Sequence, residues 1–216
     1  AADDKQMQQL NNLVMGSLVQ HDEFKAAAIP YRVAAPYYAR YTKGMTYGDH
    51  VDDPIMGGPG QQYRSDVSTT VFLNEPSEYE GGELVITTSF GEQKIKLAAG
   101  SAVVYPSSSL HHVAEVTKGT RLVAVTWSQS MIRDPAKREL LYQLNQARES
   151  LLKQRPDDKE TKQIDISYVN LVMFAEPDLC MVVVSVSDPS CFSFFTSKFT
   201  NIMSSFRARY PSKIYW

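Results

Sequence analysis

The sequence predicts a mostly β fold with flanking helices, in which the β part is a double-stranded β-helix, or jelly roll. From about residue 31 to 127 the chain consists of short runs rich in Val, Ile, Thr, Tyr and Phe, and turn clusters such as GGPG, EYEGG and TKGT separate them at fairly regular intervals. Such spacing is typical of antiparallel barrels and sandwiches. On either side of this region, apolar residues recur at helical spacing.

The composition agrees with one globular domain carrying appendages. The chain has 216 residues, of which 43% are hydrophobic and 21% charged, within the usual range for soluble proteins. A net charge of −2 gives no indication of a nucleic-acid partner. No run approaches the roughly 18 apolar residues of a transmembrane helix. Cys180 and Cys191 lie far in sequence from every histidine, so we expect free thiols in a reducing compartment. The expectation is a soluble, cytoplasmic protein without membrane or nucleic-acid partners.

The first 30 residues form the predicted N-terminal helical segment. Within residues 4–27, apolar residues recur at helical spacing, namely Met7, Leu10, Val14 and Leu18. We expect this helix to end before Pro30. The opening AADDKQ has neither an initiator Met nor a signal pattern, which indicates a trimmed or partial chain.

Residues 31–130 form the predicted jelly-roll domain. Eight strands are expected, near residues 37–41, 48–52, 67–73, 83–88, 93–97, 101–105, 111–116 and 121–128. Eight short strands are the number that a jelly roll requires.

Residues 131–176 are predicted to form two helices that pack on the barrel. The first has Asp134 as its N-cap and Pro135 at its first position. The second spans about 164–176 and ends before Pro177. The remaining residues, 177–216, form an apolar tail with a Phe-rich helical stripe, for which core packing, a partner contact or homo-oligomer formation are the expected roles.

His50 and Asp52 stand two positions apart in YGDHVDDP. On a strand, such residues point to the same face and can bind one metal ion together. The pattern His-x-Asp is weak evidence alone, because it also arises by chance between two ordinary polar residues.

A third ligand is available in the late strand that begins PSSSLHHVAEV. Either His111 or His112 can supply it, but adjacent strand residues point to opposite faces, so we expect one ligand at most. His21 lies before the barrel and is the weaker candidate. Two histidines and one carboxylate leave open positions on a metal, as in non-haem Fe(II) oxygenases.

Arg121 begins the alternating strand RLVAVTW and shares a face with Val123, Val125 and Trp127. A charge on an apolar inward face is costly unless it meets an anion. A guanidinium binds a carboxylate through two parallel hydrogen bonds. The alternative is a strand-end arginine that pairs with Glu115 or with solvent.

From about residue 31 to 176 the chain resembles the PKHD-type hydroxylases, cupin-like Fe(II)- and 2-oxoglutarate-dependent dioxygenases related to prolyl 4-hydroxylases. Four segments carry the resemblance in order and at nearly constant spacing: YGDHVDDP, RSDVSTTVFLNEPSEYEGGELVI, KLAAGSAVVYPSSSLHHVAEVTKGTR and WSQSMIRD. Members of this family usually carry a further N-terminal segment before the region where this chain begins.

The resemblance implies roles for individual residues. His50, Asp52 and His111 match the iron ligands, and Arg121 matches the residue that binds the distal carboxylate of 2-oxoglutarate. Tyr41 matches a tyrosine directed toward this co-substrate. Phe72 stands where some relatives carry a second tyrosine.

The resemblance also implies the reaction. Fe(II), 2-oxoglutarate and O2 would hydroxylate a C–H bond, on a prolyl or other residue of a peptide or protein, with release of succinate and CO2 and with ascorbate as a reductant. No catalytic residue beyond the metal ligands is required. The Gly-rich stretch DDPIMGGPGQQYRSD, directly after the first two ligands, is a candidate lid or an ordinary connecting loop.

Three other functions are compatible with the sequence. The same chemistry can act on a small molecule or a siderophore-like compound. A non-catalytic jelly-roll module can hold a metal or anion, although a structural site is more often closed by a fourth ligand. An interaction protein can use the Phe-rich tail as its binding surface.

Overall fold

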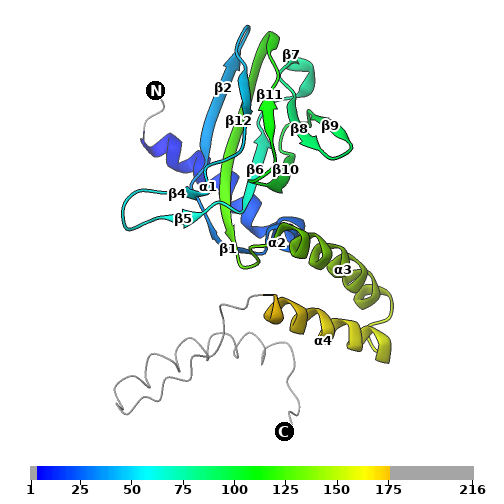
Figure 1. Cartoon of the computed structure of the whole chain (residues 1–216). Coiled ribbons are helices and arrows are strands. Elements are labelled where there is room, and N and C mark those ends of the chain that lie inside the picture. The colour runs from blue at the N-terminus through cyan, green and yellow to red at the C-terminus, as the bar shows by residue number, and fades with distance from the viewer. Residues whose placement is uncertain (1–3, 176–216) are drawn as a thin grey trace. The chain divides into compact units, whose positions relative to one another are not determined.

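The computed structural model describes residues 4–175 (Figure 1). They lie in the first of two units into which the chain divides, Ala1–Pro177. The predictions made for the apolar tail, including those for Cys180 and Cys191 and for an oligomer contact, lie outside the described residues.

Two antiparallel sheets form the β part. The larger sheet contains β1 (Pro30–Val33), β2 (Tyr37–Thr42), β6 (Val67–Phe72), β7 (Tyr79–Gly81), β10 (Ala102–Pro106) and β12 (Val116–Ser130). The smaller sheet contains β3 (Tyr47–His50), β8 (Leu84–Thr88), β9 (Gly91–Ile95) and β11 (His111–Val113). A separate hairpin joins β4 (Ile55–Met56) to β5 (Tyr63–Arg64), and a short helix, η1 (Pro76–Glu78), precedes β7.

The strand order identifies a jelly roll. The larger sheet runs β1-β12-β6-β10, with β2 and β7 also on β12, and the smaller sheet runs β3-β11-β8-β9. The chain passes from one sheet to the other and back between β2 and β12, so that strands distant in sequence become neighbours. This topology confirms the predicted fold class, and each of the eight expected strands has a counterpart.

Four short strands and several strand boundaries differ from the predictions. β1, β4, β5 and β7 are two to four residues long, too short for a periodicity to be visible. The expected strand over 111–116 divides, since β11 ends at Val113 and the 15-residue β12 already begins at Val116. The expected strand over 48–52 ends at His50.

The predicted N-terminal helix is interrupted at His21, and its second part ends before Pro30, as expected. His21 has extended backbone angles, φ −70° and ψ 125°, and separates α1 (Asp4–Gln20) from α2 (Asp22–Ala28). Both helices lie on the outer face of the larger sheet (Figure 1). Leu18 and Phe24 belong to one buried cluster with Val67, and Val14 belongs to another with Val71.

The two C-terminal helices are α3 (Pro135–Gln154) and α4 (Lys159–Phe174), which pack against each other. Asp134 caps α3 as predicted, because its carboxylate accepts a hydrogen bond from the Ala136 N–H at 2.8 Å. In the part of the chain that the structure describes, no helix has both the length and the apolar character needed to cross a membrane.

One face of β6 packs against α1 and α2, and its opposite face lines the interior of the jelly roll. Val67 and Val71 point to α1 and α2, whereas the alternate residues Ser68 and Phe72 point between the sheets. Leu84, Ile86 and Tyr105 form a buried cluster in this interior. Residues of β6 therefore connect the outer core with the space enclosed by the two sheets.

Candidate metal centre

His50 and His111 face each other across β3 and β11. They are register partners in this antiparallel pair, and their ring centroids lie 4.2 Å apart. Cross-strand partners project to the same face of a sheet. His111 is 4% exposed and His50 is half-buried. The register of two short strands thus places both imidazoles together.

Asp52 joins them from the segment that follows β3. Its backbone N–H donates to the Ser107 carbonyl at 3.1 Å, and its carboxylate Oδ2 accepts from the Ser68 hydroxyl. The other carboxylate oxygen, Oδ1, lies 3.9 Å from Nε2 of His50 and 3.9 Å from Nε2 of His111. Hydrogen bonds, rather than strand periodicity, orient this side chain.

The three side chains offer a set of ligand atoms to one ion. One ligand atom of each lies within 4.8 Å of the other two. Nδ1 of His50 lies 2.8 Å from the Gly48 carbonyl, and Nδ1 of His111 lies 2.9 Å from the Ser109 carbonyl. Since a carbonyl only accepts, each Nδ1 carries the proton and each Nε2 keeps its lone pair for a metal.

The two remaining histidines stay apart from this cluster. Nδ1 of His112 is 2.8 Å from Oδ1 of Asp49, on the other face of β11. His21 lies at the junction of α1 and α2, on the outer face of the larger sheet. Of the two adjacent histidines, His111 points inward to the cluster and His112 points to the other face of β11.

Arg121 is buried without a carboxylate partner. Its residue is 1% exposed, its Nε has no hydrogen-bond partner, and no ion pair involves it among residues 4–175. The expected alternative, a pair with Glu115, is absent from that set. Burial lowers the pKa of the guanidinium, and nearby phenols, that of Tyr41 first, oppose this shift. An arginine in this state is suited to bind an anion.

Aromatic rings enclose the guanidinium. Its Cζ lies 5.1 Å from the ring centroid of Tyr41, its register partner on β2, and 5.8 Å from that of Phe72. Gly82, with φ +67°, leaves the room that the arginine occupies, because a Cβ there would lie 3.2 Å from Cδ of Arg121 and 2.9 Å from Val116. Burial raises the pKa of Tyr41, which therefore stays a neutral hydrogen-bond donor.

Tyr105 connects the histidine cluster with Arg121. Its ring lies 5.1 Å from that of His111. Burial raises the pKa of its hydroxyl; the charge of Asp52 raises it further, and Thr70 and Arg121 lower it. The same interior therefore contains the three candidate ligands, the Tyr105 phenol and the buried guanidinium of Arg121.

Sequence reasoning missed Tyr105, Ser68 and Ser107. Ser68 and Tyr105 are register partners on β6 and β10, and Ser107 follows β10 directly. A serine in a strand such as VSTTVF gives one usable signal, since a hydroxyl at an inward position needs a partner.

The hairpin formed by β4 and β5 borders an open groove of about 740 Å³, whose lining includes Asp53, the residue after Asp52. Side chains that line it include Arg32, Tyr37, Asp53, Ile55, Tyr63 and Trp127. Tyr37 and Trp127 meet edge to face, with centroids 5.6 Å apart. The stretch predicted as a lid or connecting loop is thus a hairpin beside an aromatic groove.

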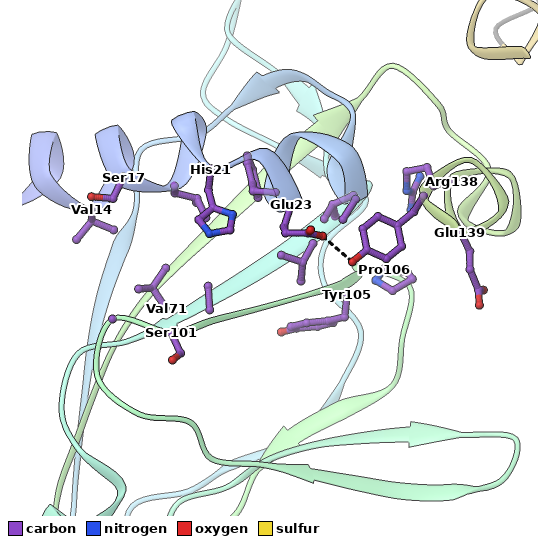
Figure 2. A pocket seen from close by; sticks show the side chains of 18 of the residues that line it. Val14, Ser17, His21, Glu23, Val71, Ser101, Tyr105, Pro106, Arg138 and Glu139 are labelled. Atoms are coloured by element: carbon purple, nitrogen blue, oxygen red, sulfur yellow. Dashed lines mark hydrogen bonds between the residues drawn. The ribbon is translucent and has the colours of Figure 1, made fainter. Parts of the chain in front are cut away.

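A second groove, of about 1090 Å³, lies on the outer face of the larger sheet (Figure 2). Val14 and His21 line one side and Val71 and Ser101 another, while a hydrogen bond of 2.7 Å from the Tyr142 hydroxyl to Glu23 lies near one end. None of the three candidate ligands lines this groove.

Residues 36–129 match the family model described as the 2OG-Fe(II) oxygenase superfamily. The PKHD-type hydroxylase Tgr7_2199 of Thioalkalivibrio sulfidiphilus is 53% identical over 169 residues, which cover 78% of this chain and 75% of that protein. A PKHD-type hydroxylase of Shewanella frigidimarina is 47% identical over 169 residues, or 77% of this chain and 75% of that protein.

Solved structures share a lower similarity. A Pseudomonas putida prolyl-4-hydroxylase is 24% identical with a TM-score of 0.42, and the match covers 53% of this chain and 65% of that one. A cupin domain from Bordetella pertussis is 17% identical with a TM-score of 0.32, over 46% of this chain and 83% of that one.

Proposed function

Because the chain belongs to the PKHD-type hydroxylases, and is therefore an oxidoreductase of the dioxygenase class, we propose that it hydroxylates a C–H bond of a prolyl or other residue in a peptide or protein. The cofactors in this proposal are Fe(II), 2-oxoglutarate and O2, the co-products are succinate and CO2, and ascorbate is the reductant.

His50, Asp52 and His111 hold the Fe(II) in this proposal. Both imidazoles present Nε2 and the carboxylate presents Oδ1, so the chain supplies one ligand atom from each residue. Two histidines and one carboxylate are the ligand set of non-haem Fe(II) oxygenases, in which open positions remain for other molecules. When bound, the iron and 2-oxoglutarate supply the oxidising power.

Arg121 and Tyr41 hold the distal carboxylate of 2-oxoglutarate in this proposal. The guanidinium offers a fork of N–H donors, and the neutral Tyr41 hydroxyl offers a further donor beside it. The surrounding rings exclude water, which strengthens the attraction between the guanidinium and a carboxylate.

The observation that carries the proposal is the buried Arg121, which has no carboxylate partner in the described chain and shares its interior with the histidine cluster. A jelly-roll module that only holds a metal has no use for such a charge, because burying it without an anion is costly. A co-substrate with a free carboxylate accounts for it.

The groove beside the β4–β5 hairpin is an argument for an extended substrate such as a peptide. It is open and lined by aromatic side chains, which suits a peptide segment whose apolar side chains pack against rings. Asp53, adjacent to the proposed ligand Asp52, belongs to its wall. A substrate in this groove would therefore lie beside the metal centre.

Anaerobic titration with Fe(II) and 2-oxoglutarate tests the cofactor part of the proposal. We expect a weak visible charge-transfer band that is lost in His111→Ala and retained in His112→Ala, because only His111 points inward. A folded protein that gives no band with both additions would contradict the proposal and favour the binding-module alternative. Peptide-dependent release of succinate, compared across a panel of peptides and small molecules, tests the substrate class.

A further inference from the structure

Two serine hydroxyls connect in series to the carboxylate of Asp52. The Ser68 hydroxyl donates to Oδ2 of Asp52, and Oγ of Ser107 lies 2.7 Å from Oγ of Ser68. Ser68 is fully buried and Ser107 is 3% exposed. Both hydroxyls are therefore shielded from water and depend on these contacts for their hydrogen bonds.

The direction of the series follows from the number of protons. An ionised carboxylate only accepts, so the single hydroxyl proton of Ser68 goes to Asp52. The Ser68 oxygen can then only accept from Ser107, and Ser107 must be the donor. The result is a chain of two hydrogen bonds, from Ser107 to Ser68 to Asp52, whose last member is assisted by the carboxylate charge.

These two hydrogen bonds make the two carboxylate oxygens of Asp52 different from each other. Oδ2 is engaged by Ser68, whereas Oδ1 lies 3.9 Å from Nε2 of each histidine. If Oδ2 were free, the carboxylate could turn and offer both oxygens to a metal. The hydroxyl of Ser68 holds it in the orientation that offers one.

Ser107 also fixes the backbone of Asp52. Its carbonyl accepts from the Asp52 N–H at 3.1 Å, and its own N–H donates to the Asp66 carbonyl at 3.1 Å. Two residues later, the Ser109 carbonyl accepts from Nδ1 of His111. One short loop between β10 and β11 thus orients two of the three candidate ligands.

On the basis of the proposed function, we infer that Ser68 and Ser107 are positioning residues that present Asp52 to the metal through Oδ1 alone. Neither serine touches the metal. Their role is to fix the carboxylate before the metal binds, as hydrogen-bonded partners of metal ligands commonly do.

The test compares Ser68→Ala and Ser107→Ala with Ser128→Ala as the matched control. Ser128 is fully buried on β12, beside Val67 in register, and its hydroxyl has no hydrogen-bond partner among the described residues. All three variants remove one buried hydroxyl from neighbouring parts of the larger sheet. The probe is Co(II) alone, which does not oxidise readily and absorbs in the visible range.

Ser68→Ala should weaken Co(II) affinity by roughly tenfold or more and alter the visible spectrum of the bound ion, since losing such a partner typically costs 10–100-fold. Ser107→Ala should weaken affinity less, because Ser68 keeps its bond to Asp52. Ser128→Ala should have the same Co(II) affinity and visible spectrum as the unsubstituted protein. A purely structural role of Ser68 would lower the melting temperature without changing the affinity or the spectrum.

Equal Co(II) affinity and spectra in Ser68→Ala and Ser128→Ala would overturn the inference while leaving the proposed function intact. If Ser68→Ala does not fold, Ser107→Ala decides, and its equality with Ser128→Ala overturns the inference. A folded, unchanged protein that binds no Co(II) would overturn the proposed metal site, and this inference with it.

Discussion

Arg121 is the residue whose surroundings are hardest to explain in the protein without a ligand, because its charged guanidinium is buried without an anion among the described residues. Burial removes it from water, and the rings of Tyr41 and Phe72 compensate only part of that loss, since a cation–π contact contributes about 0.5–2 kcal/mol. Its Nε is left without a partner. In the proposed function, a bound carboxylate would recover the free energy that this costs in the empty protein.

Arg121→Met is therefore expected to weaken 2-oxoglutarate binding without lowering the stability of the protein. Met fills a similar volume without a buried charge, so the free energy of unfolding of the empty protein should stay within about 1 kcal/mol or rise. The affinity for 2-oxoglutarate in the presence of Fe(II) should fall by roughly 100-fold or more, the equivalent of about 3 kcal/mol. Chemical denaturation and anaerobic titration measure the two quantities.

Arg40→Met is the control for this substitution, because Arg40 lies next to Tyr41 on β2 but is exposed. It should leave 2-oxoglutarate affinity unchanged. If Arg121→Met retained the affinity, the distal carboxylate would have to bind elsewhere.

At this scale the histidines and charged residues that the structure brings together could be singled out from the sequence, and the hydroxyl-bearing ones could not. His50 and Arg121 have few structural roles in a strand, so each indicated chemistry. Ser68 is one of several hydroxyl-bearing residues in β6, which are ordinary in strands, and only the fold reveals that it meets Asp52.

Among the elements, the β4–β5 hairpin combines the shortest strands with a position beside the proposed active site. Each of its strands has two residues. Gly57, at its turn, has φ +93°, and a Cβ there would collide with the Gln61 carbonyl. Gly58, the next residue, has open space around its Cα and no such backbone constraint. The two glycines therefore test the hairpin with nearly identical substitutions.

Gly57→Ala should disturb the hairpin and Gly58→Ala should not. Strain of this kind costs about 1–3 kcal/mol, so we expect hydroxylation of a peptide substrate to fall by roughly tenfold in Gly57→Ala. Fe(II) and 2-oxoglutarate binding should stay unchanged, because no proposed ligand lies in the hairpin. Peptide turnover and the charge-transfer titration provide the two readouts, and equal turnover in both variants would show that the hairpin does not contact substrate.

Predictability at the element scale follows strand length only in part, because the longest strand, β12 (Val116–Ser130), was predicted to begin five residues too late, at residue 121. The longer strands β2, β6 and β8 were predicted within about two residues, since alternation and turn residues delimit them. β4 and β5 were not, because a pair of residues has no period. The orientation of Asp52 could not be predicted from the neighbouring sequence either. It depends on the loop between β10 and β11, which is distant in sequence.

On the scale of the whole molecule, the larger sheet separates two environments. Its outer face packs on α1 and α2, and its inner face encloses the candidate metal centre. β6 contributes to both, with Val67 on one side and Ser68 on the other. Periodicity predicted the helices and the strands but not which face of the sheet each helix covers. The division of the chain at residues 30, 130 and 176 stays a prediction.

Phe24→Ala tests whether the two faces are energetically independent. Phe24 is 3% exposed and belongs to the cluster with Leu18 and Val67, so its loss should lower the free energy of unfolding by about 3–5 kcal/mol. Phe90→Ala is the control, since Phe90 is 97% exposed at the turn between β8 and β9 and should change neither stability nor binding.

Well below the melting temperature, folded Phe24→Ala should bind Fe(II) with unchanged affinity. The reason is that the hydrogen bonds between Ser68, Ser107 and Asp52 lie within the inner face and do not involve the helices. A lower Fe(II) affinity in the folded variant would mean that repacking of Val67 displaces Ser68 through the backbone of β6. In that case the packing of α2 would be part of what positions Asp52, and the two faces of the sheet would act as one structure.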